Sequence, residues 1–118
     1  MQINVSMQGG SVGGELVELF ERQVGYALGR FHPRIRAVRL RLRDLNADKG
    51  GVDKHGRITA ALRDGGTLTA EVTDTAYAGV IHRCVERLAR QVQRQWGEAR
   101  TRARSAAAAR KRDTGVGE

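Results

Sequence analysis

The chain has 118 residues, enough for one folded domain with a modest core. Its 21 Lys and Arg residues outnumber 13 Asp and Glu, and the formal net charge of +8 favours a polyanionic partner, most simply nucleic acid. No apolar run fits a membrane-spanning helix, and the first residues lack the charged start and apolar core of a signal peptide. We therefore expect a cytoplasmic protein with no membrane partner.

A strand and a helix are the first elements predicted. Apolar and polar residues alternate from Met1 to Met7, which is the period of a half-buried strand. Between Ser11 and Arg30 the apolar residues recur at helical spacing, and Ser11 is the expected N-cap. Pro33 closes off this helix, because the residue before a proline is disfavoured in the helical conformation.

Three strands and a second helix follow. Residues 35–45 alternate apolar residues with arginines, which predicts a strand with a cationic outer face. Residues 57–62 and 67–73 flank an Asp-Gly-Gly turn, which predicts a β-hairpin. The second helix is expected to begin near Asp74, a good N-cap residue, and to bury one apolar stripe. The stripe comprises Tyr77, Ile81, Cys84, Val85, Leu88 and Val92.

The order of these elements predicts the fold class. A β-α-β-β-β-α chain most economically forms an α+β fold, a four-stranded sheet with both helices packed on one face. A right-handed crossover sets the first two strands parallel and leaves the remaining pairs antiparallel. The apolar stripe stops at Trp96, so we assign residues 1–96 to the folded domain and residues 97–118 to a basic low-complexity tail, disordered or a frayed helix.

The stretch DLNADKGGVDKHGR, residues 44–57, is the segment closest to a ligand loop, yet its spacing fits none. It lacks the alternating ligands and final Glu of an EF-hand, and it lacks the Gly-Lys-Ser/Thr ending of a P-loop. Cys84 is expected in the core, and the three histidines form no ligand pair. We therefore expect no catalytic residue, no metal, no cofactor and no small-molecule substrate.

Two basic surfaces are candidates for contact with RNA. The outer side of the second helix carries a row of like charges, whose mutual repulsion of roughly a few tenths of a kcal/mol per pair an anionic partner would relieve. The open sheet face carries the arginines of the second strand. Because aromatic residues are too few for a stacking platform, both surfaces favour recognition of the backbone over the bases. The helix row is Arg83, Arg87, Arg90 and Arg94, and the strand set is Arg39, Arg41 and Arg43.

Several stretches, taken in order, resemble the ribosome hibernation-promoting factor family, also called ribosome-associated inhibitor A or sigma 54 modulation proteins. They are MQINVS at the start, VRLRL leading into DLNADKGGVDK, the hairpin, and ERLARQVQRQ in the second helix. The likeness covers roughly residues 1–96 and implies the same β-α-β-β-β-α fold. A chain of this length corresponds to the short form, without the C-terminal dimerisation domain of the long form.

The resemblance implies a non-enzymatic protein that binds the small ribosomal subunit at the decoding region of 16S rRNA. Such a protein inhibits translation and preserves idle ribosomes under stress. The residues that it places on rRNA are Arg22, Arg30, Arg83, Arg87, Arg90 and Arg94, with Lys49 and Lys54 as loop candidates.

Two other hypotheses stay open at this point. One is a general RNA-binding or RNA-chaperone module that works through Arg39, Arg41 and Arg43 on the sheet face. The other, which the missing catalytic constellation disfavours, is an enzyme or regulator acting on a small anionic ligand.

Overall fold

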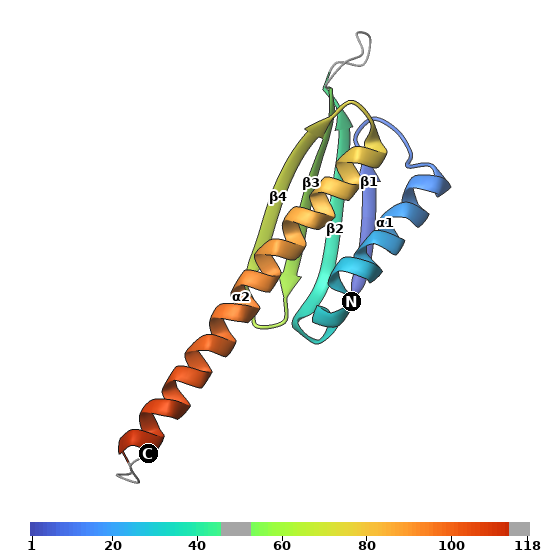
Figure 1. The fold of residues 1–118 in the computed structure, drawn as a ribbon. Coiled ribbons are helices and arrows are strands. Elements are labelled where there is room, and N and C mark those ends of the chain that lie inside the picture. The colour runs from blue at the N-terminus through green and yellow to red at the C-terminus, as the bar shows by residue number, and fades with distance from the viewer. Residues whose placement is uncertain (46–52, 114–118) are drawn as a thin grey trace.

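The computed structural model describes residues 1–45 and 53–113, with side chains up to residue 95. Its elements confirm the predicted β-α-β-β-β-α order (Figure 1). They are β1 (Gln2–Met7), α1 (Gly14–Leu28), the 3₁₀-helix η1 (Gly29–Arg34), β2 (Ile35–Asp44), β3 (Lys54–Leu62), β4 (Thr67–Asp74) and α2 (Tyr77–Asp113).

The strands form one four-stranded sheet in the order β1-β2-β3-β4. β1 pairs with β2 in parallel, as a crossover through α1 requires, and the β2-β3 and β3-β4 pairs are antiparallel. Both helices lie side by side on the same face of this sheet (Figure 1). The predicted layer arrangement and strand directions are therefore confirmed, and no element of the described ranges covers the other sheet face.

The core fills the space between the sheet and the two helices. Every second residue of β2 is buried there, and α1 and α2 each contribute one apolar side. Burial of a large apolar side chain contributes about 1.5–3 kcal/mol, so this layer is the main source of stability. The largest fully buried side chains include Phe20, Leu28, Ile35, Leu40, Leu42, Ile58, Ile81 and Leu88.

Both predicted helix starts are wrong. α1 begins at Gly14 with Gly13 as its N-cap, and the Gly13 carbonyl accepts the first hydrogen bonds in place of Ser11. Asp74 is the last residue of β4, and its carboxylate accepts a 2.6 Å hydrogen bond from the amide of Thr75. The β3-β4 ladder extends to Asp74, so the chain leaves the sheet later than the capping pattern suggests and α2 begins at Tyr77.

The backbone of α2 stays helical well beyond the last packed turn. It runs from Tyr77 to Asp113, a length of 37 residues, and its later turns project away from the sheet (Figure 1). The division into a domain of residues 1–96 and a tail of residues 97–118 stays a prediction. In the described ranges, no helix combines the length and apolar character needed to cross a membrane.

Gly56 allows α2 to lie close to β3. A Cβ atom at this position would overlap Val80 Cγ1 and would lie 3.3 Å from both Cys84 Sγ and Leu42 Cδ2. A glycine inside a strand often marks such a close approach. The separation between α2 and the sheet therefore depends on the absence of a side chain here.

Gly56→Ala is expected to lower the free energy of unfolding by about 1–3 kcal/mol, because an added methyl group overpacks the helix-sheet contact. Urea denaturation followed by circular dichroism measures the loss. Gly66→Ala is the matched control, since a Cβ there would lie 3.6 Å from its nearest neighbours, an ordinary contact. Equal losses in the two variants would contradict this account of the packing.

Candidate nucleic-acid interface

The arginine row of α2 is exposed on the helical side of the molecule, as predicted. Arg83 Nε lies 3.8 Å from an Asp74 carboxylate oxygen, and Arg90 forms a 3.0 Å ion pair with Glu86 one helical turn earlier. The Arg90–Glu86 pair is exposed on both sides and such pairs contribute only about 0–1 kcal/mol, so a phosphate group can displace Glu86, and the long Arg83–Asp74 approach leaves Arg83 able to turn to a phosphate. Arg94 makes no ion pair or hydrogen bond within the described ranges.

Arg87, the remaining member of the row, is engaged in the fold. Its guanidinium donates a 2.8 Å hydrogen bond to the main-chain oxygen of Glu71, and Gln91 donates a 3.0 Å hydrogen bond to the main-chain oxygen of Thr69. Both acceptors belong to β4, which is an edge strand of the sheet. Unpaired main-chain groups at a sheet edge can pair with another chain, so Arg87 and Gln91 help to protect this edge by occupying two of its carbonyl oxygens. Arg87 is thus a weaker candidate for contact with RNA than its neighbours.

The α2 row also borders a hollow on the surface. This hollow has a volume of about 510 Å³ and lies beside β4. Guanidinium and amide donors line it together with Leu68, and these donors suit phosphate and sugar oxygens. Its lining residues are Leu68, Arg87, Arg90, Gln91, Arg94 and Gln95.

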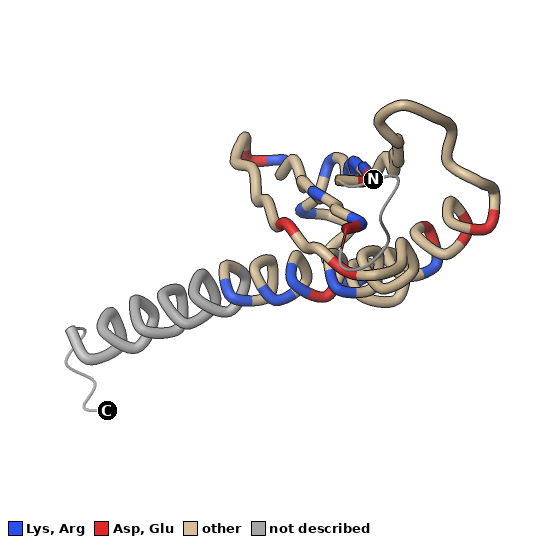
Figure 2. The backbone as a smooth tube through the Cα atoms, turned by 90° about the horizontal axis from the view of Figure 1, so that it is seen from above, with Lys and Arg blue, Asp and Glu red and all other residues tan. Residues whose placement is uncertain are grey.

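The surface of α1 is less basic than that of α2. Arg22 and Arg30 are exposed, and the Arg30 guanidinium lies 4.8 Å from the centroid of the Phe31 ring. Acidic residues dominate the first turns of α1, whereas basic residues dominate the described turns of α2 (Figure 2). α1 therefore offers fewer favourable contacts to a polyanion than α2. The exposed acidic residues are Glu15, Glu18 and Glu21.

The two loop candidates differ in what the structure says of them. Lys49 lies outside the described residues. Lys54 Nζ lies 2.8 Å from Asp44 Oδ2 and 3.4 Å from Asp53 Oδ1, and 5.6 Å from the centroid of the Tyr77 ring. The hydrogen bond with Asp44 raises the pKa of Lys54. The ion pair with Asp44 connects β3 to β2. Because two carboxylates already neutralise the charge of Lys54, this side chain attracts a phosphate only weakly.

The open sheet face carries the alternative set, and its members are exposed and side by side. Arg39, Arg41 and Arg43 alternate with buried residues along β2, and Arg57 of β3 lies directly opposite Arg41 in the register. Of the described strand residues on this face, Glu71 alone is acidic, and its carboxylate lies 3.2 Å from His55 Nε2. The charge on this face is therefore nearly all positive.

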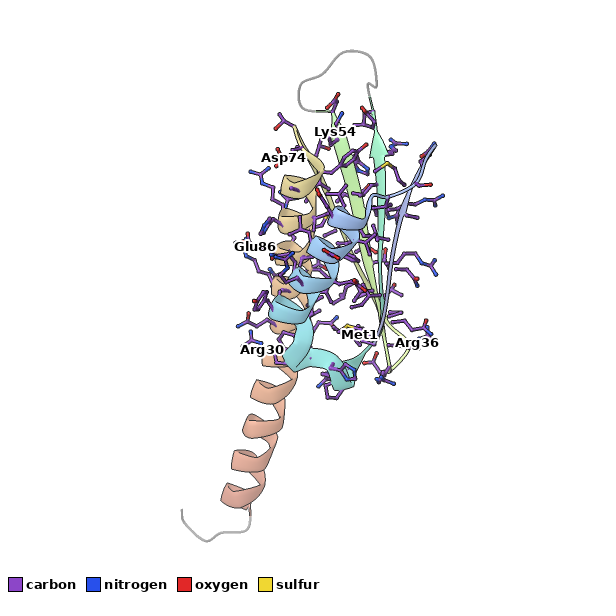
Figure 3. All side chains as sticks on the ribbon, turned by 90° about the vertical axis from the view of Figure 1, so that its right-hand side faces the viewer. Met1, Arg30, Arg36, Lys54, Asp74 and Glu86 are labelled. Carbon is purple, nitrogen blue, oxygen red and sulfur yellow. The ribbon has the colours of Figure 1, made fainter. Side chains whose placement is uncertain are left out.

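Sequence reasoning missed Arg36 as part of this face. The β2-β3 register shifts between Ile35 and Ala37, so the simple alternation breaks at Arg36. Its side chain lies on the sheet side of the molecule, whereas Arg30 lies on the helical side (Figure 3). A bulge of this kind leaves no clear mark in a run of alternating residues, and no signal in the sequence pointed to it.

The thiol of Cys84 belongs to the core. Cys84 is fully buried among apolar residues, and burial raises its pKa to about 12. Among the described residues, no group of three or more His, Cys, Asp and Glu side chains could hold a metal ion. The features that stand out are thus two exposed basic surfaces on opposite sides of one sheet.

Solved structures show the same arrangement of strands and helices. The N-terminal domain of Thermus thermophilus Protein Y superposes with a TM-score of 0.65 and 22% identity, over 80% of this chain and 98% of that domain. A ribosomal subunit interface protein from Coxiella burnetii gives a TM-score of 0.70 and 18% identity, over 82% of this chain and 99% of that protein. The chain has the fold of these two proteins.

Both proteins belong to the hibernation-promoting factor family, so the resemblance found in the sequence is confirmed at the level of the fold. No protein-family model and no curated protein matches the chain. The Protein Y fold explains why the two basic surfaces are separate, since the helices cover one sheet face and leave the other open.

Cys84 is expected to resist thiol reagents while the protein is folded. With a pKa of about 12, only about one thiol in ten thousand is ionised near pH 8, and the surrounding side chains exclude the reagent. A colorimetric disulfide-exchange assay should give no fast phase in buffer and one equivalent of product in denaturant. Fast labelling of the folded protein would show that the α2 stripe is open.

Lys54→Gln is expected to lower the melting temperature, because the buried carboxylate of Asp53 loses its cation. Since hydrogen bonding raises the pKa of Lys54, its contribution is complete below the ordinary value of 10.5 and disappears as the pH rises through the raised folded-state pKa. Thermal unfolding at several pH values measures both effects. Arg57→Gln removes the same charge from an unpaired position and should leave the melting temperature unchanged or higher; equal losses would refute the bridging role.

Proposed function

We propose that the chain is a member of the hibernation-promoting factor family that binds the ribosome without catalysing a reaction. The observation that carries this proposal is the match of its β-α-β-β-β-α unit to 98% and 99% of two solved proteins. One of these is named as a ribosomal subunit interface protein. A formal net charge of +8 adds the electrostatic attraction that a surface made of rRNA requires.

The proposed target is 16S rRNA at the decoding region of the small subunit. In this proposal the folded domain occupies the decoding region. It thereby excludes mRNA and tRNA and inhibits translation. Idle ribosomes are preserved under stress while the site is filled. Binding to ribosomes also places the chain in the cytoplasm.

The α2 row is the surface that we propose for rRNA. Arg90 and Arg94 border the same hollow, and Arg83 extends the row toward the start of the helix. Arg90 pairs with an exposed carboxylate, Arg83 approaches Asp74 only at 3.8 Å, and Arg94 has no partner among the described residues, so contact with phosphates costs little. Arg22 and Arg30 add charge from the neighbouring helix, whereas Arg87 and Lys54 are already engaged in the fold.

We expect the purified protein to co-sediment with small ribosomal subunits in a low-salt sucrose gradient and to dissociate steeply as salt rises. Each phosphate contact releases counterions, so replacing Arg83, Arg90 and Arg94 together by Gln should weaken binding and reduce the slope of log K against log salt by about two to three. A titration of salt in the gradient measures both.

The control is a variant that removes the same charge from the sheet face, Arg39→Thr with Arg41→Thr and Arg43→Thr. It should still co-sediment, because its substitutions lie on the opposite side of the domain from the α2 row. A parent protein that stays at the top of the low-salt gradient would overturn the proposal.

A further inference from the structure

The open sheet face holds the largest group of uncompensated charges in the described part of the chain. None of the arginines at positions 39, 41, 43 and 57 makes an ion pair or hydrogen bond with a described residue. The α2 row, in contrast, has partners for most of its members. Like charges that gather on one surface without neutralising partners indicate a site for a ligand of opposite charge.

The register makes this surface unfavourable for the isolated protein. Arg41 lies directly opposite Arg57 across the β2-β3 pair, and like charges in that position destabilise a sheet. Glu71 of β4 lies opposite Arg57 on its other side, so one carboxylate offsets part of the charge of Arg57 and none lies opposite Arg39, Arg41 or Arg43. On the other side of β2, the neighbours of Arg39 and Arg41 are Asn4 and Ser6, which carry no charge. A polyanion lying over β2 would remove the repulsion and convert it into attraction.

Two hollows extend this surface along the sheet. One, of about 520 Å³, lies toward the end of β2 and contains Arg41, Arg43 and Arg57 together with His55 and Glu71. The second, of about 660 Å³, lies toward the start of β2 and contains Arg36, Arg39 and Arg63. The six arginines thus form a continuous basic track, and the hydroxyls of Thr59 and Thr67 line the second hollow beside it.

The spacing and chemistry of this basic track suit a nucleic-acid strand. Alternate residues of a strand are about 6.6–6.8 Å apart, a distance comparable to that between successive phosphates of a single strand. Guanidinium groups bind phosphate oxygens through paired hydrogen bonds. Among the described residues no Phe, Tyr or Trp lines either hollow, and His55 is the single aromatic ring there, so a stacking platform is missing and recognition is mainly of the backbone.

A protein partner fits the same face less well. Stable protein interfaces have an apolar or aromatic centre surrounded by a polar rim. Here the exposed face consists mainly of arginines, threonines and small residues, with His55 and Glu71 at one end, and the large apolar side chains of the strands point to the core. Charge complementarity without an apolar centre favours a flexible polyanion.

We propose that the basic track binds the phosphate backbone of a single-stranded RNA segment along β2. This goes beyond ribosome binding through α2, because the two surfaces lie on opposite sides of the domain: Arg36 marks the sheet side and Arg30 the helical side (Figure 3). The domain therefore holds an RNA strand on its sheet while its helices contact another RNA surface. The recognition is independent of base sequence.

Fluorescence anisotropy with a labelled oligouridine of about 12 nucleotides tests this proposal on the full chain. The variant with Arg39, Arg41 and Arg43 replaced by Thr should bind at least about tenfold more weakly, with a salt slope lower by about two, since each single-strand contact contributes about 0.7. Threonine favours strands, so the variant should fold, and circular dichroism verifies this. Arg57→Thr, on the neighbouring strand, is a second variant in the same direction.

The matched control replaces Arg83, Arg90 and Arg94 by Gln and leaves the track intact. It changes the net charge equally and also removes any contact of the oligonucleotide with α2, so it should lose some affinity, but clearly less than the sheet variant, at most about threefold. Equal losses in both triple variants, or no loss in the sheet variant, would overturn the proposal. So would displacement of the RNA by a polyglutamate peptide of equal charge, since the track would then accept acidic polypeptides as readily.

The result with oligouridine can be separated from the result of the ribosome assay. A failure on oligouridine leaves co-sedimentation through the α2 row untouched, and a failure of co-sedimentation leaves the oligouridine result valid. Each assay uses the other's variant as its control, so the two surfaces are tested independently.

Discussion

The burial of one face of β2 constrains the rest of this molecule. Val38, Leu40 and Leu42 are fully buried beneath the helices. Successive side chains of a strand point to opposite faces, so the arginines between these residues have to lie on the open face. A register slip of one residue would bury the arginines and expose the core. The interaction that builds the core therefore also builds the cationic face.

The two basic surfaces differ because helices and strands compensate charge differently. On a helix, Glu86 reaches Arg90 across one turn, so a local partner is available within the same element. On β2 the nearest neighbours come from other strands, and they are the uncharged residues of β1 and Arg57 of β3. The helical surface is thus partly neutralised by its own sequence, whereas Glu71 is the one acidic residue among the described strand residues of the sheet surface. This difference supports separate roles for the two sides.

Polar and reactive side chains at the end of β2 and the start of β3 hold neighbouring elements together. Lys54 pairs with Asp44 across the β2-β3 ladder and also approaches the buried Asp53. Cys84 packs beside Gly56 where α2 contacts β3. In the described ranges these groups stabilise the contacts between elements, and the exposed arginines are left to meet a partner.

Local patterns were sufficient for part of this description. The alternation in residues 35–45 and 57–73 and the helical spacing of the second helix predicted the elements, their order and the burial of Cys84. The connection between the first two strands, long enough for a helix, predicted their parallel pairing. The starts of the helices were wrong, because capping residues such as Ser11 and Asp74 indicate where a helix can begin and tertiary packing selects the actual residue.

By itself, then, the sequence determined the element order, the apolar face of each element and the net positive charge, because each depends on residues close together in the chain. Only the tertiary structure decided which charges are neutralised. Strand register sets the pairing of Lys54 with Asp44 and the position of Arg36. The packing of α2 against the sheet sets the contact of Arg87 with the β4 edge. Register joins residues that are distant in sequence, and a pattern within one element does not contain it.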